Sequence, residues 1–299
     1  MMMGEIFEMF QEGFMRFRLR CLWVLVVLST AAMASESRVP QEPAPPDLSA
    51  ALDRVYTLQQ QVRDLHPAFD HLYPVAVVRG GTFYVYEPDL GARHYKLAVT
   101  APDKLNVPSG VRAAMPLDFW GNRVACVITP EALDDAGGLI VVFHEFVHCY
   151  QWETCELRLK EKLGVYRAAM GRKDYMWELQ YAFPYGDGDF RQYYGAMIAA
   201  LYKGDSAGLE AARRKLKEAL SPDDWDYMTW QEWKEGLARY LENAIQTRLG
   251  RPENRGGLEP PFTRVTFYAG GAGLIRELSG RQPGVLKDIE ALYHRIAER

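Results

Sequence analysis

The sequence predicts an α+β protein in which a small N-terminal β-sheet is followed by a mainly helical C-terminal half. Two observations lead to this prediction. Between residues 75 and 129 the chain contains short runs of β-branched and aromatic residues, which are typical of strands. After Asp135 the pattern is mainly helical, and Ser221, Pro222 and two following acids form a strong helix start.

The individual elements follow in order along the chain. Apolar residues near helical spacing predict an amphipathic helix over residues 49–65, before Pro67. Strands are expected over residues 75–79, 82–87, 95–100 and 123–129. We therefore expect a single domain over residues 49–299, which is rich in strands over 70–130 and helical over 136–299.

The first 34 residues are predicted to be a signal peptide. Arg16, Arg18 and Arg20 precede an apolar run over residues 21–28, and Ala-Met-Ala at 32–34 offers a small-x-small cleavage pattern. The run is shorter than the ~20 residues that a bilayer span needs, so cleavage after Ala34 is favoured over a membrane anchor. We expect export to the periplasm or the extracellular space, no stable membrane span after cleavage, and a Pro-rich linker over residues 35–48.

Composition and charge exclude several classes of protein. With 48% hydrophobic and 25% charged residues, the chain is neither disordered nor fibrous. The formal net charge is −4 and the basic residues are dispersed, so we expect no nucleic-acid partner. The sequence does not indicate an oligomeric state.

Three cysteines would remain after cleavage, at Cys126, Cys149 and Cys155. In an oxidising compartment, Cys126 could form a disulfide with one of the other two. The alternative is that all three are buried as small apolar side chains.

Residues 144–148, His-Glu-Phe-Val-His, carry the chemistry that the sequence indicates most directly. On a helix, His144 and His148 lie about 40° apart on one face, so both can bind one ion. Glu145 projects between them, close enough to hold a water molecule. This arrangement suits zinc-assisted hydrolysis with Glu145 as general base. Because the flanking residues are apolar, the helix should be buried, where uncompensated polar groups are costly. The alternative is that both histidines merely hydrogen-bond to backbone.

The segment 233–242, Trp-Lys-Glu-Gly-Leu-Ala-Arg-Tyr-Leu-Glu, resembles the glutamate helix of the gluzincins, a group of zinc peptidases. The likeness is closest to their aminopeptidase-like branch, although one residue is missing before Glu235 and Leu237 replaces a Phe. The resemblance implies a zincin-like fold with Glu235 as the third zinc ligand and Glu232 in reserve. Glu242 lies seven residues on, on the same helix face, where it could orient a ligating histidine. The alternative is that the acids of this segment form a solvated face of the helix.

The segment 267–275 resembles the Tyr-x-x-Gly-small pattern of the same branch. This resemblance implies that the hydroxyl of Tyr268 stabilises an oxyanion, whereas a packing tyrosine is the alternative. The chain has no Gly-x-Met-Glu-Asn element, which anchors the substrate's amino group in true aminopeptidases of this branch. The sequence therefore does not predict aminopeptidase activity.

Taken together, these patterns predict an exported zinc metallopeptidase that hydrolyses peptide bonds in a peptide or protein substrate. One alternative is a catalytically inactive, zincin-like binding module that a metal stabilises. Another is an envelope interaction protein without metal. The aromatic residues between 175 and 194 are expected to pack in the core rather than to line a substrate cleft.

Overall fold

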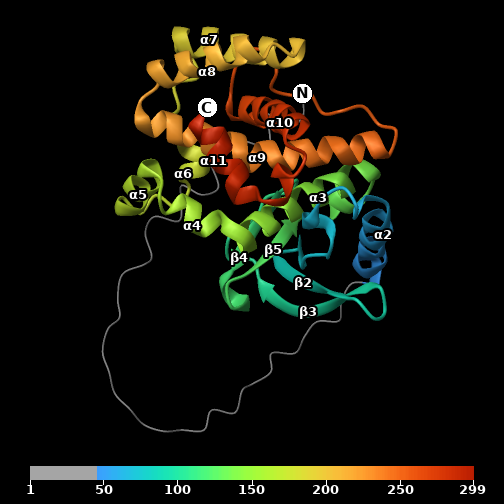
Figure 1. Ribbon diagram of the computed structural model, residues 1–299. Coiled ribbons are helices and arrows are strands. Elements are labelled where there is room, and N and C mark those ends of the chain that lie inside the picture. The colour runs from blue at the N-terminus through green and yellow to red at the C-terminus, as the bar shows by residue number, and fades with distance from the viewer. Residues whose placement is uncertain (1–45) are drawn as a thin grey trace, which may run out of the picture. The chain divides into compact units, whose positions relative to one another are not determined.

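The computed structural model describes residues 46–299, so the predicted signal peptide and its cleavage site lie outside the described residues (Figure 1). The described chain divides into two compact units. The first contains Tyr73–Leu139 together with the described residues up to Tyr56. The second contains Thr57–Leu72 and Ile140–Arg299. We refer to them as the sheet unit and the helical unit.

The sheet unit contains a five-stranded mixed sheet with the strand order β3-β2-β1-β5-β4. The strands are β1 (Val75–Arg79), β2 (Thr82–Asp89), β3 (His94–Pro102), β4 (Arg112–Leu117) and β5 (Arg123–Ile128). All neighbours are antiparallel except β1 and β5, which are parallel. The β1–β2 hairpin has a two-residue turn, Gly80-Gly81, in which both residues have positive φ, as a type I′ turn requires.

The remaining elements are helical, and most lie in the helical unit. The α-helices are α2 (Pro46–Val62), α3 (Ala136–Gln151), α4 (Leu157–Lys160), α5 (Gly164–Gly171), α6 (Trp177–Gln180), α7 (Gly188–Lys203), α8 (Ser206–Ala219), α9 (Pro222–Arg248), α10 (Arg264–Arg281) and α11 (Ile289–Glu298). Short 3₁₀ turns are η2 (Pro67–Phe69), η3 (Asp118–Trp120), η4 (Pro130–Leu133) and η6 (Val285–Lys287), and η5 (Trp152–Glu156) is a π-helical turn after α3. Helices α2 and α3 contribute residues to both units.

Helix α9 is the central element of the helical unit. It packs against α10 and α11, while α7 packs against α8 (Figure 1). Its start is as predicted, because the Ser221 hydroxyl accepts a hydrogen bond from the amide of Asp224 and Pro222 is the first helical residue. Asp187 caps α7 in the same way by accepting from the amide of Phe190 at 2.9 Å.

Two glycines let the backbones of α9 and α10 come very close. A Cβ atom on Gly271 of α10 would lie 2.1 Å from the carbonyl oxygen of Glu232 of α9. A Cβ atom on Gly236 of α9 would lie 2.7 Å from the backbone of Gly271. No other residue type fits at such a crossing without a shift of the helices. The crossing places Glu235, next to Gly236, directly beside α10.

The aromatic residues of the 175–194 stretch pack mainly in the core, as expected. Phe183, Phe190 and Tyr194 are buried, and all three rings contact the ring of Phe267 on α10. Tyr175 is the exception, with 75% of its surface exposed.

The cysteines follow the second of the two alternatives. Cys149 and Cys155 are free thiols, so neither forms the disulfide considered for Cys126. All three side chains are buried. Burial also raises the pKa of the Cys155 thiol to about 12, which keeps it protonated near neutral pH.

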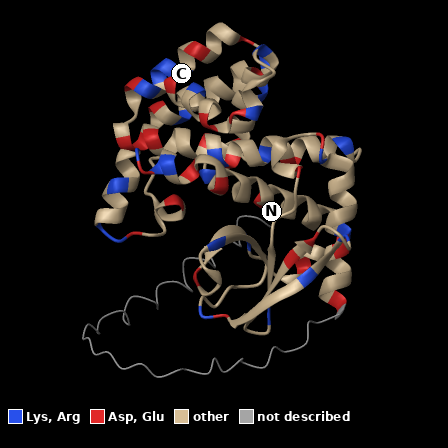
Figure 2. Cartoon of the chain, turned by 60° about the horizontal axis from the view of Figure 1, so that its bottom comes forward, with Lys and Arg blue, Asp and Glu red and all other residues tan. Residues whose placement is uncertain are grey.

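The predicted α+β class is confirmed, with the sheet in the N-terminal part and the helices mainly in the C-terminal half. Strand β4 was not predicted, and the first helix begins at Pro46, inside the segment predicted to be a linker. Within residues 46–299, every helix is too short or too polar to span a bilayer. Figure 2 shows basic and acidic residues interspersed over the described chain, which agrees with the dispersed charge of the sequence.

Candidate metal centre

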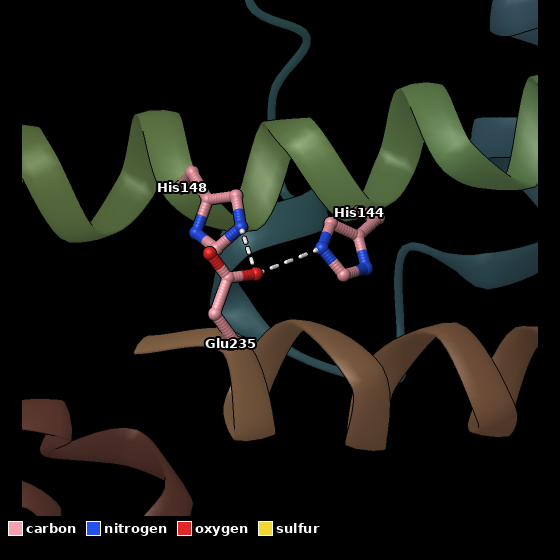
Figure 3. A group of neighbouring side chains, drawn as sticks. All are labelled: His144, His148 and Glu235. Atoms are coloured by element: carbon pink, nitrogen blue, oxygen red, sulfur yellow. Dashed lines mark ion pairs between the residues drawn. The ribbon is translucent and has the colours of Figure 1, made fainter. Parts of the chain in front are cut away.

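Helix α3 places His144 and His148 on one face, one turn apart, with both rings directed toward α9 (Figure 3). The helix is buried as predicted: from Leu139 to Gln151 only Val141 and Tyr150 are partly exposed. Each histidine exposes only 7% of its surface, and Glu145 between them exposes 6%. Two imidazoles and a carboxyl group are therefore buried on an otherwise apolar helix, which requires compensation by polar partners.

The carboxylate of Glu235 on α9 comes within reach of both imidazoles. Its Oε2 atom lies 3.5 Å from Nε2 of His144 and 3.3 Å from Nε2 of His148 (Figure 3). Zinc binds nitrogen and carboxylate oxygen at about 2.0–2.2 Å, so two of its ligand atoms at tetrahedral corners lie about 3.3–3.5 Å apart. The donor set of two imidazoles and one carboxylate, with ligand atoms within 4.8 Å of one another, could thus hold a metal ion. Within residues 46–299 it is the only group of this kind.

Glu242, two turns after Glu235 on the same face of α9, fixes the orientation of His144. Its Oε2 atom lies 3.0 Å from Nδ1 of His144 and accepts from Nε of Arg239 at 3.2 Å. Its Oε1 atom accepts from the side chain of Asn254 at 2.9 Å. Although burial opposes ionisation, these partners lower the pKa of Glu242 to about 2. An ionised carboxylate can only accept, so Nδ1 of His144 carries a proton and Nε2 faces Glu235.

His148 is oriented by a neutral partner. Its Nδ1 atom lies 2.8 Å from Oε1 of Gln151, and Nε2 of the same amide donates to the carbonyl of Lys234 at 3.1 Å. Because the amide nitrogen is used on the backbone, the amide oxygen is the acceptor toward the ring. His148 therefore also carries its proton on Nδ1 and directs Nε2 toward Glu235.

The second oxygen of Glu235 has a different partner. Oε1 accepts a hydrogen bond of 3.0 Å from Nη1 of Arg264, the first residue of α10. Burial opposes ionisation of Glu235, but its interactions with His148, Arg264 and His144 hold the pKa of this carboxyl well below its usual range. Burial also opposes the charged form of His144, but hydrogen bonds to Glu235 and Glu242 raise the pKa of that ring to about 10.

Tyr268 lies at the same site, one turn after Arg264 on α10. Its ring stacks near that of His144, with centroids 6.1 Å apart and planes inclined by 20°. The guanidinium groups of Arg239 and Arg264 lie 5.4 and 5.2 Å from the centre of its ring. Burial is the main cause that raises the pKa of the Tyr268 phenol well above its usual range, and a hydrogen bond to Glu235 adds to this shift.

Two acids close in sequence to the site residues lie elsewhere in the structure. Glu232, the reserve ligand, is fully buried but pairs with Arg213 of α8 at 2.7 Å. It is therefore not available to a metal held by the two histidines. Glu153 lies near His71 at 4.0 Å, and both side chains are half-exposed.

The structure thus brings together all six residues that the sequence singled out, three on α3, two on α9 and Tyr268 on α10. The sequence reasoning missed Gln151, Arg264 and Asn254. The first two carried a usable signal, because Gln151 follows His148 by three residues and Arg264 precedes Tyr268 by four, the spacings of neighbours on one helix face. Asn254 lies in the loop between α9 and α10, where no periodicity indicates its contact.

Comparison with known proteins adds no relative to this description. No family model, curated protein or solved structure matches the chain.

Proposed function

We propose that this protein is an exported zinc-dependent peptidase of the gluzincin type, which hydrolyses peptide bonds in a peptide or protein. The observation that carries the proposal is the convergence of His144, His148 and Glu235 at distances that suit a tetrahedral ion. The three residues come from two helices and are all buried. Two buried histidines on one helix with a glutamate between them match the chemistry of metal-assisted hydrolysis.

The ligand residues and their supports have distinct tasks in this proposal. When bound, zinc supplies a Lewis acid that polarises a carbonyl group and lowers the pKa of a water molecule. His144, His148 and Glu235 hold the ion, while Glu242 and Gln151 keep the two imidazoles turned with Nε2 inward. Glu145 takes the proton from the attacking water and passes it to the leaving amine.

In this proposal, Tyr268 donates a hydrogen bond to the carbonyl oxygen of the substrate. Because its pKa is raised, the phenol stays protonated at neutral pH and can donate a hydrogen bond. Negative charge appears on the carbonyl oxygen only as the water attacks, so a donor placed there stabilises the transition state more than the ground state.

Metal analysis tests the first part of the proposal. Protein purified under metal-replete conditions should contain about one zinc ion per chain, and His148→Ala should abolish this binding. Iron in place of zinc would contradict the assignment, since two histidines and one carboxylate also suit non-haem iron. If no metal is bound at all, the alternative of an envelope interaction protein without metal is favoured.

Glu145→Gln tests catalysis separately from metal binding. We expect peptide hydrolysis to fall about 10²–10⁴-fold while the zinc content stays the same. The control is Glu153→Gln, which changes a half-exposed acid shortly after the same helix and should keep full activity. If Glu145→Gln is as active as the unaltered protein, the hydrolytic mechanism fails and the metal-stabilised binding module is favoured.

Export is tested on the mature protein. Expression with the full N-terminus in a bacterium should yield a protein whose first residue is Ser35. Recovery of the uncleaved chain in the membrane fraction would instead indicate an N-terminal anchor.

A further inference from the structure

The two oxygens of Glu235 face different partners. Oε2 lies 3.3–3.5 Å from the two inward nitrogens of His144 and His148, whereas Oε1 is 3.0 Å from Nη1 of Arg264. The carboxylate thus presents one oxygen to the histidines and the other to a guanidinium group. This division matters because a buried carboxylate can bind a metal ion through one oxygen or through both.

Arg264 is held firmly in this position. The same Nη1 atom donates to Oε1 of Gln231 at 3.1 Å, and only 13% of the arginine side chain is exposed. The guanidinium group also lies over the ring of Tyr268, 5.2 Å from its centre. Gln231 in turn donates to the carbonyl of Glu178 at 3.4 Å. Contacts to α9 and to Tyr268 of its own helix therefore fix the donor that faces Oε1.

The consequence concerns the coordination number of the ion. A catalytic zinc site has three protein ligands and keeps one position open for water or substrate. If Glu235 bound through both oxygens, it would occupy two positions and compete with the water molecule. A charge-assisted hydrogen bond to Oε1 opposes this, because turning Oε1 toward the ion would separate the buried guanidinium group from its carboxylate and leave it only the neutral amide of Gln231 as an acceptor.

We propose that Arg264 is a positioning residue that keeps Glu235 bound through one oxygen and so leaves a coordination position for the attacking water. The inference rests on the proposed zinc site but goes beyond it, since the ligands alone do not determine how the carboxylate binds. Arg264 does not touch the ion or the substrate in this role. It acts through Glu235.

Cobalt substitution tests the proposal by a readout that is independent of activity. Co²⁺ in a four-coordinate site absorbs visible light more strongly than Co²⁺ in a five-coordinate site. We expect the strong absorption in the unaltered protein and a weaker, five-coordinate spectrum in Arg264→Met, which keeps an apolar stem but has no donor. The control is Arg276→Met on the same helix, whose side chain is 58% exposed and pairs with Glu253.

The activity should change in parallel. With the water position obstructed, kcat of Arg264→Met should fall about 10–100-fold, the usual effect of losing a partner of a metal ligand, and KM should change less. Arg276→Met should match the unaltered protein in both spectrum and kcat.

The outcomes separate this inference from the function it rests on. If the unaltered protein takes up no Co²⁺ and no Zn²⁺, the metal site and this inference both fail. If it binds Co²⁺ but Arg264→Met gives the same strong spectrum, only the role of Arg264 is refuted. If Arg264→Met does not fold, X-ray absorption of the zinc-loaded unaltered protein decides the matter: four ligand atoms around the zinc support the proposal, and five overturn it.

Discussion

Gly271→Ala places a methyl group 2.1 Å from the carbonyl oxygen of Glu232, whereas ordinary van der Waals contact begins at 3.4 Å. The neighbour is backbone, so no side chain can rotate away and the helices α9 and α10 must separate. Overpacking of this kind costs about 3 kcal/mol at the upper end of the usual range. The higher helix propensity of alanine offsets about 1 kcal/mol of this cost. The free energy of unfolding should therefore fall by about 2 kcal/mol.

The assay is thermal unfolding followed by circular dichroism, in which this loss corresponds to a decrease in Tm of about 4–8 °C. Gly280→Ala is the matched control, because Gly280 lies on the same helix and its Cβ would meet nothing within 4 Å. That substitution should raise stability by about 0.5–1 kcal/mol. If Gly271→Ala is as stable as Gly280→Ala, the close crossing of α9 and α10 is refuted.

Three further predictions concern buried charge and a helix cap. The depressed pKa of Glu242 means that its ionised form stabilises the metal-free protein above about pH 4.5, and that this contribution is lost as the pH falls toward 2. As the pH is lowered, the free energy of unfolding should therefore fall less steeply for Glu242→Gln than for the unaltered protein. The exposed Glu218→Gln should follow nearly the same pH dependence as the unaltered protein. In urea unfolding, Arg213→Met should lower the free energy of unfolding by about 3–5 kcal/mol, because it leaves the buried carboxylate of Glu232 without its ion-pair partner. Combining it with Glu232→Met should restore most of this loss. Asp187→Ala should cost about 1 kcal/mol in the same assay, since it removes the cap of α7.

Much of the fold could be predicted from local sequence patterns. The strands β1, β2, β3 and β5 are rich in β-branched and aromatic residues, and their positions were predicted to within a few residues. Strand β4 was not, because Arg-Ala-Ala-Met-Pro-Leu has low strand propensity and contains Pro116. It forms at the edge of the sheet, where its pairing with β5 decides its conformation and where proline is tolerated.

The candidate site was predictable where its geometry is local. His144, Glu145 and His148 lie on one helix, so their spacing alone places them together. The approach of Glu235 depends on how α9 packs against α3, and only a resemblance between motifs pointed to it. The spacing of Arg264 and Tyr268 places both on one face of α10, but the contact of Arg264 with Glu235 depends on the close crossing of α9 and α10, which no periodicity in the sequence indicates.

The two histidines are symmetric in the motif but not in their electronic environment. The imidazole of His144 donates to an anionic carboxylate, whereas that of His148 donates to a neutral amide. A proton drawn toward a carboxylate leaves more electron density on the ring, so His144 is the more basic donor through Nε2. An ion held by both rings would therefore receive unequal electron donation from the two Nε2 atoms, which should give separate ¹⁵N resonances.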